Sequence, residues 1–186
     1  MYLNRNMSLK WGFGRMIKMF RGYHGTDATR ANVIDDDGLI PSSKWHWLGG
    51  GYYYYDDDSL AARWGGPNPV VYTSILEAEA NRVLDTMSAN GRELLDRIWS
   101  WLNSESSHKL PNLRSNQDHL AYTLVEVLQN EDLGLIGKFD MIRAIYNKSA
   151  PLQNYFQTGL TTDTEIHICV KNIECIKSFE RVCDHG

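Results

Sequence analysis

A chain of 186 residues with a formal net charge of −4 has the length of one domain and the composition of a globular protein. This length supports a core without disulfide or metal staples, and the net charge excludes a surface that is basic throughout. No apolar run approaches the ~20 residues of a membrane span, and charges interrupt any candidate secretory signal, so we expect a cytoplasmic protein with no membrane partner.

Residues 1–21 are predicted to form a basic arm ahead of a single domain over residues 22–186. Trp11 and Phe13 stand among its cations, and interleaved cations and aromatic rings can hold a nucleic-acid backbone or a membrane surface. The alternative is a terminus whose charges are solvated, and both hypotheses stay open. The cations, all of which precede the first acidic residue, are Arg5, Lys10, Arg15, Lys18 and Arg21.

The first half of the domain combines glycine-rich turns with short predicted elements. A helix is predicted over residues 27–37, with apolar residues on one side and Gly38 as its end. The run from Tyr52 to Tyr55 predicts a strand, in which Tyr53 and Tyr55 face one side and the other two tyrosines face the opposite side. A β-branched and aromatic segment predicts a further strand over residues 69–76.

The middle of the chain is predicted to be helical. Apolar residues recur at helical spacing over residues 91–103, 117–129 and 139–148, and the last of these helices ends before Pro151. A polar segment over residues 104–115 is predicted to be a loop.

Near the C-terminus, residues 165–170 alternate strictly and predict a half-buried strand. Ile166, Ile168 and Val170 fall on one face, and Glu165, His167 and Cys169 fall on the other. With strands at both ends and helices between them, the order of elements predicts an α+β fold in which the N- and C-terminal strands join one split sheet.

Three cysteines lie close to the C-terminus, at Cys169, Cys175 and Cys183. Their spacing matches none of the usual zinc patterns, so we expect no metal site. An odd, widely spaced set is typical of reduced thiols in a reducing compartment, and we interpret these residues as structural.

Three motifs occur in a fixed order along the chain. The first is the tetrapeptide Tyr23 to Thr26, and the second is Leu48 to Tyr54, followed by Ala62 and Trp64. The third is the strand that begins Thr164-Glu165-Ile166. Together they resemble the motifs of ADP-ribosyltransferases of the poly(ADP-ribose) polymerase and diphtheria-toxin type, whose signature is a His-Gly-Ser/Thr strand, a Gly-x-Tyr-Phe-like strand and a late glutamate.

The resemblance implies an ADP-ribosyltransferase-like split β-sheet with a helical middle segment, and NAD as a substrate without a metal. His24 is then expected to bond the adenosine ribose. The backbone of Gly25 is expected to hold the nicotinamide carboxamide, which a glycine allows because it has no side chain in the way. Thr26 would supply a hydroxyl near the adenosine end.

The same resemblance implies that Tyr53 and Trp64 enclose the nicotinamide ring. Glu165 matches the catalytic glutamate, with His24 and Tyr53 completing the catalytic set. Cleavage of the nicotinamide–ribose bond passes through an oxocarbenium-like transition state, comparable to that of glycoside cleavage. A carboxylate beside the ribose would stabilise that developing positive charge.

The sequence departs from the family pattern at two positions. Ala61 stands where many relatives carry a serine that bonds the nicotinamide amide, so this contact is missing or comes from elsewhere. Asp27 stands where relatives often carry a cation, and Arg30 is the nearest cation that follows it.

The acceptor is expected to be macromolecular, and the basic arm favours nucleic acid over protein. A small free-standing domain of this type is expected to be a toxin of a toxin–antitoxin or phage-defence system, which predicts an antitoxin protein as a partner. Two alternatives stay open: a non-catalytic module that binds NAD or ADP-ribose, and a nucleic-acid-binding protein that acts through its basic arm.

Overall fold

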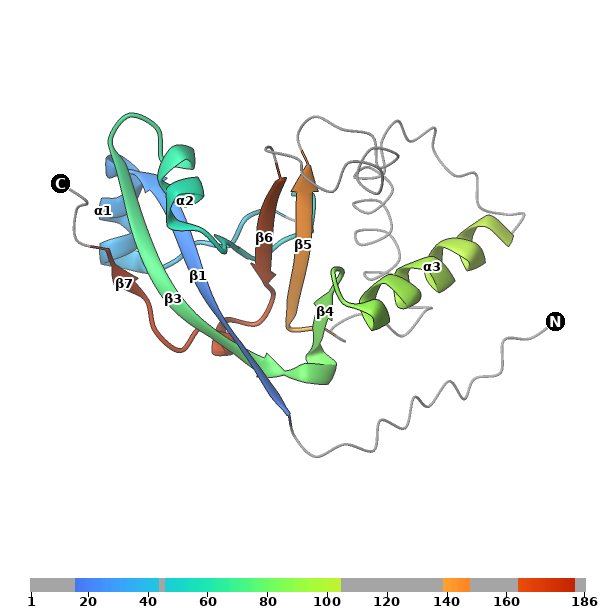
Figure 1. Ribbon diagram of the computed structural model, residues 1–186. Coiled ribbons are helices and arrows are strands. Elements are labelled where there is room, and N and C mark those ends of the chain that lie inside the picture. Colours follow the sequence, from blue (N-terminus) through green and yellow to red (C-terminus); the bar gives the residue numbers. More distant parts are fainter. Residues whose placement is uncertain (1–15, 44–45, 105–138, 148–163, 183–186) are drawn as a thin grey trace.

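A computed structural model describes residues 16–43, 46–104, 139–147 and 164–182, which form an α+β fold around one mixed sheet (Figure 1). The α-helices of these segments are α1 (Ala28–Asp37), α2 (Asp58–Trp64) and α3 (Ala89–Ser104). The strands are β1 (Ile17–Asp27), β2 (Tyr52–Tyr55), β3 (Pro69–Glu79), β4 (Val83–Asp85), β5 (Met141–Asn147), β6 (Thr164–Val170) and β7 (Glu180–Arg181). Their order across the sheet is β4-β5-β6-β2-β1-β3-β7.

The sheet consists of two well-paired halves with a narrow junction between β1 and β2. The long strands β1 and β3 pair antiparallel over eleven residue pairs, from Ile17↔Glu79 to Asp27↔Pro69. In contrast, β1 and β2 share the single pair Tyr23↔Tyr55. On the other side, β6 pairs antiparallel with both β2 and β5. The strands from both ends of the chain therefore belong to one sheet, as predicted.

Local sequence explains the ends of α1. The Asp27 carboxylate accepts a hydrogen bond from the Arg30 backbone N–H at 2.9 Å and so caps the helix N-terminus. Gly38 ends the helix with φ 84°, a conformation that glycine adopts without a steric penalty. Ala31 and Ile34 are buried, so the predicted helix and its apolar side are confirmed.

Apolar clusters lie on both faces of the sheet, and β2 contributes to one on each face because its side chains alternate. Tyr53 packs against the cluster that α3 covers, whereas Tyr52 and Tyr54 belong to the opposite cluster, as predicted. The first cluster contains Leu48, Leu84, Ile98, Ile142, Ala144 and Cys169. The second contains Tyr54, Leu76, Ala78, Val83, Met141, Ile168, Val170 and Cys175.

The helix predicted over residues 139–148 is wrong, because residues 141–147 form β5. This segment lies between β4 and β6 and pairs with both of them, parallel to β4 and antiparallel to β6. A short apolar run fits a helix or a buried strand equally well by its period, and here the pairing with β6 decides the outcome.

The strand predicted over residues 165–170 is confirmed as β6, but it is not half-buried. Both of its faces are covered, because Glu165, His167 and Cys169 on one face are buried, as are Ile168 and Val170 on the other. The strands predicted over residues 52–55 and 69–76 and the helix predicted over residues 91–103 are also confirmed, the last two within longer elements.

Several predictions fall outside the described residues: the helix over 117–129, the loop after Ser104, Cys183 and residues 1–15 of the arm. The end of the arm, from Ile17 to Arg21, is part of β1, so the boundary at residue 22 falls inside a strand. No helix in the described part of the chain combines the length and apolar character needed to cross a bilayer.

Candidate functional site

His24 lies on β1, where its ring bonds the backbone of β2. The distance from its Nδ1 to the carbonyl oxygen of Tyr53 is 2.9 Å. A carbonyl oxygen only accepts, so Nδ1 carries the proton and donates it. Burial lowers the pKa of this imidazole below its ordinary value of 6.5, which keeps the ring neutral at pH 7. The neutral ring therefore has an acceptor lone pair at Nε2.

Gly25 and Thr26 follow on β1 beneath helix α2, and both are buried. A Cβ on Gly25 would lie 1.7 Å from the carbonyl oxygen of Ala61 in α2. Glycine at this position is thus required by the close approach of the helix to the strand. Asp57 caps α2 by accepting from the Leu60 N–H at 3.0 Å, which fixes where the helix begins.

Tyr53 is held by the loop that precedes it. Its hydroxyl donates to the Gly49 carbonyl at 2.9 Å and accepts from the Leu48 N–H at 2.8 Å. Burial, together with the nearby Cys169, raises the pKa of the phenol. The ring next to it is that of His46, with centroids 4.0 Å apart. Trp64, its expected partner, is the last residue of α2 and is 64% exposed.

Glu165 lies on β6 in an almost fully buried environment, with 6% of its surface exposed. One carboxylate oxygen is 3.1 Å from Nε2 of His167, two residues further along the same strand. The other ring nitrogen of His167, Nδ1, accepts a hydrogen bond from the indole N–H of Trp47 at 3.1 Å. The rings of Tyr55 and Tyr146 lie 4.7 and 5.0 Å from the His167 ring.

The structure brings the three motif strands together, but it does not bring all the predicted side chains together. β6, β2 and β1 are consecutive neighbours in the sheet. Tyr53 pairs in register with Cys169, four residues from Glu165, which corresponds to ~13 Å along a strand. The tyrosines near Glu165 are instead Tyr146, its partner in register on β5, and Tyr55, whose pKa is raised by burial and then by the charge of Glu165.

Four residues around Glu165 were missed by the sequence interpretation: Trp47, Tyr55, Tyr146 and His167. Alternation did place His167 on the face of Glu165 and Tyr55 on the face of Tyr53, so a signal for both existed. Tyr146 was hidden by the wrong helix prediction. Trp47 precedes β2 in a loop, where neither period nor pairing predicts the direction of a side chain.

The glycine run from Gly49 to Gly51 is tied to β6 by a lysine. The Lys171 ammonium donates to the carbonyls of Leu48 and of Gly50, the latter at 2.7 Å. Gly51 has φ 151°, and a Cβ there would lie 2.6 Å from the Val170 carbonyl oxygen. The run therefore presents carbonyls to a cation, which differs from the amide cradle that binds a phosphate.

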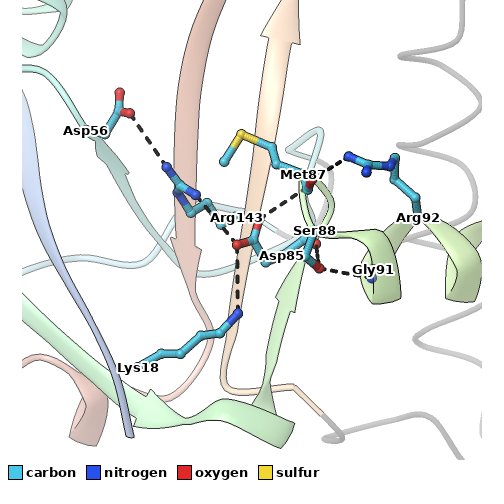
Figure 2. A network of polar contacts seen from close by, with 8 residues as sticks. All are labelled: Lys18, Asp56, Asp85, Met87, Ser88, Gly91, Arg92 and Arg143. Atoms are coloured by element: carbon cyan, nitrogen blue, oxygen red, sulfur yellow. Dashed lines mark hydrogen bonds and ion pairs between the residues drawn. The ribbon is translucent and has the colours of Figure 1, made fainter.

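A second polar cluster joins β1, β4 and β5 with Asp56, which follows β2 (Figure 2). Arg143 pairs with Ile168, so the cluster lies on the face of the sheet opposite Glu165. Arg143 of β5 lies 3.6 Å from the carboxylate of Asp85 and 4.0 Å from that of Asp56, and Lys18 of β1 lies 3.8 Å from Asp85. Burial raises the pKa of Asp56. Two cations and two acids balance in charge, so this cluster links strands and offers no strong field to a ligand.

The same cluster extends to the start of α3. The Asp85 carbonyl accepts from the Ser88 hydroxyl at 2.7 Å, and this hydroxyl in turn accepts from the Gly91 N–H at 3.0 Å (Figure 2). Within the described residues there is no group of three or more histidine, cysteine or acidic side chains that could hold a metal ion. Cys169 and Cys175 are buried free thiols.

Two comparisons with known proteins give no match. No protein-family model matches the sequence, and no curated protein does. What the site can do chemically must therefore be argued from its own groups: a buried carboxylate with a histidine donor and aromatic rings around this pair, and a neutral histidine with an acceptor nitrogen on β1.

Proposed function

We propose that the chain is a mono-ADP-ribosyltransferase that cleaves NAD at the nicotinamide–ribose bond and transfers ADP-ribose to a macromolecular acceptor. The observation that carries the proposal is the strand order β6-β2-β1. Three motifs that are far apart in the sequence are carried by neighbouring strands, with Glu165 at one end and His24 at the other. The narrow β1–β2 junction likewise supports an ADP-ribosyltransferase-like split sheet.

The chemistry of Glu165 agrees with this activity. The transition state for loss of nicotinamide places positive charge on the ribose, and a fixed carboxylate lowers its energy most where water is excluded. Glu165 is buried among aromatic rings, so its charge is poorly screened there. Nε2 of His24 can accept from a ribose hydroxyl, which is the group that the motif resemblance assigns to it.

Nicotinamide release tests the proposal. Glu165→Gln keeps the size of the side chain and removes its charge, so it should lower the rate of nicotinamide release from NAD by about 10²-fold or more. Glu174→Gln, at an exposed position, is the matched control and should leave the rate unchanged. The rate is measured by chromatography, and circular dichroism checks the fold of each variant.

A chain that binds NAD without releasing nicotinamide would instead be a non-catalytic NAD or ADP-ribose-binding module. Titration calorimetry with NAD on the unmodified chain makes this distinction. Equal rates for Glu165→Gln and the unmodified chain would also contradict the proposed role of the carboxylate.

For the acceptor, we propose nucleic acid in preference to protein, because the cations of the arm other than Lys18, which pairs with Asp85, favour a polyanion. Labelled NAD is incubated with the chain and a cell extract, and the products are digested separately with nuclease and protease. Release of the label by nuclease is expected, and release by protease alone would reverse the preference.

The biological role that we propose is that of a toxin in a toxin–antitoxin or phage-defence system. Induced expression should then stop cell growth, whereas expression of the Glu165→Gln variant should not. A protein that restores growth when co-expressed would be the antitoxin. Growth at an equal rate with both forms would contradict this role.

A further inference from the structure

The hydrogen bonds from Trp47 through His167 to Glu165 join a loop to the proposed catalytic carboxylate. We propose that His167 is a positioning residue: its Nε2–H, with the tautomer fixed by Trp47, holds the Glu165 carboxylate for the reaction. This inference rests on the proposed function and concerns the orientation of the carboxylate.

The proton positions follow from the donors. An indole N–H can only donate, so Nδ1 of His167, which lies 3.1 Å from it, must be an unprotonated acceptor. The ring proton is then on Nε2, where the Glu165 oxygen at 3.1 Å accepts it. While the Trp47 bond persists the imidazole has no site for a second proton, so His167 meets Glu165 as a neutral donor.

Three aromatic side chains also pack around the His167 ring and restrict its rotation. It stacks on Tyr146 of β5 at an interplanar angle of 19°, and Tyr55 of β2 meets its edge at 75°. Trp47 meets it from the loop at 71°, with centroids 5.4 Å apart. The side chain is almost fully buried, so the ring cannot turn and exchange its two nitrogens without displacing these contacts.

A neutral donor suits the proposed reaction better than a cationic one. A protonated imidazole would cancel much of the carboxylate charge at the point where the ribose becomes positive. A neutral N–H instead fixes one oxygen while leaving the full negative charge in place. Orientation of this kind is worth about 10²-fold in rate when a reacting group shifts by ~1 Å.

Two substitutions separate positioning from simple packing. The amide nitrogen of glutamine can occupy the place of Nε2 and still donate, so His167→Gln should keep kcat for nicotinamide release within about threefold. His167→Leu fills the space without a donor and should lower kcat by about 10²-fold, with the KM for NAD little changed.

Trp47→Phe tests the tautomer, because it keeps an aromatic ring but removes the indole donor, so Nδ1 of His167 can take up a proton. The loss of activity at acidic pH should therefore begin closer to neutrality than in the unmodified chain.

The tautomer is measured independently of activity by nitrogen-15 NMR of the histidine rings in the full chain. We expect a protonated Nε2 and a bare Nδ1 for His167, and the opposite arrangement for His24, which serves as an internal reference.

A protonated Nδ1 on His167, or equal kcat for the Gln and Leu variants, would overturn the positioning role. If the unmodified chain releases no nicotinamide, the proposed function fails and the positioning role fails with it. That outcome differs from a failure of this inference alone, in which nicotinamide is released but the expected tautomer or the Gln–Leu difference is absent.

Discussion

The two described histidines of the proposed site differ in which nitrogen carries the proton, and the backbone and indole around them decide this. His24 donates from Nδ1 to a carbonyl, whereas Nδ1 of His167 accepts from an indole. One ring therefore presents an acceptor nitrogen and the other a donor, although the amino acid is the same. Hydrogen-bond partners of this kind are not encoded next to the histidine in the sequence: they lie 29 and 120 residues away.

At the residue scale, the burial of His24 predicts that the folded chain becomes less stable at acidic pH. Its pKa is lowered in the folded chain, so between that pKa and 6.5 the unfolded chain binds more protons than the folded one. The free energy of unfolding should thus decrease as pH falls below about 6.5, by at most about 1.4 kcal/mol per pH unit. Urea unfolding at pH 7.5 and pH 5.5 measures it.

The variant His24→Asn isolates this effect, because asparagine can keep a donor near the Nδ1 position and does not titrate. It should reduce the loss of stability between the two pH values. His46, whose pKa is also lowered by burial, acts in the same direction, so part of the loss should remain. An unchanged pH dependence in His24→Asn would show that the histidine is not the cause.

Also at the residue scale, any side chain at Gly25 should clash with helix α2 and destabilise the fold. In Gly25→Ala the new methyl group would lie 1.7 Å from the Ala61 carbonyl oxygen, so α2 must move away from β1. We expect a loss of at least about 2 kcal/mol of unfolding free energy, measured in urea.

Gly66→Ala is the control for Gly25→Ala. Gly66 has φ 80° and open space around the new methyl group, so the variant should lose only about 1 kcal/mol through backbone strain. Similar losses in both variants would mean that the contact between α2 and β1 is not tight.

At the scale of elements, a salt bridge between Arg82 and Asp140 fixes the position where β5 begins. Arg82 follows β3, and its guanidinium makes two hydrogen bonds to Asp140, at 2.6 and 2.9 Å, just before β5 begins. The Asp140 backbone also pairs with Arg82 and with Lys171. This one residue thus fixes the start of β5 relative to the end of β6.

Replacing Arg82 by Met should therefore destabilise the fold by about 1.5–3 kcal/mol, because it removes both guanidinium hydrogen bonds from the half-buried Asp140 carboxylate and leaves it the hydrogen bond of Asn172. Arg97→Met provides the control, since the ion pair of Arg97 with Glu93 on α3 is exposed and should contribute no more than about 0.5 kcal/mol. Equal denaturation midpoints for the two variants would contradict the proposed anchor.

The elements also explain which predictions from the sequence are correct. α1 and β6 carry their own signals, namely the Asp27 cap, the Gly38 end and the strict alternation of β6, so both are predicted correctly. The spacing of apolar residues in β5 fits a helix and a strand equally well, and the pairing with β6 makes it a strand. The set around Glu165 depends on contacts between β2, β5, β6 and a loop. Alternation gives the faces of His167 and Tyr55, but no local signal gives the contacts between these elements. The resemblance named Glu165 and Tyr53, whereas Tyr55 lies closer to Glu165 in the sheet.

At the scale of the whole molecule, the junction between the two halves of the sheet should be its least stable part. The single pair Tyr23↔Tyr55 connects β1 to β2, whereas β5 and β6 share seven pairs. Amide hydrogens at Tyr23 and Tyr55 should exchange with solvent faster than those at Ile168 and Val170, by at least about tenfold. Hydrogen exchange followed by NMR measures this, and equal protection would indicate a continuous sheet.

The hydrogen bonds from Lys171 to the carbonyls of Leu48 and Gly50 limit how the loop before β2 can move. These bonds connect the loop that carries Trp47 to the end of the strand that carries Glu165. Movement of that loop alone would take both carbonyl acceptors away from the ammonium and break the Trp47–His167 hydrogen bond. We therefore expect the loop and β6 to move as one unit relative to β1, to which β2 is joined by a single residue pair.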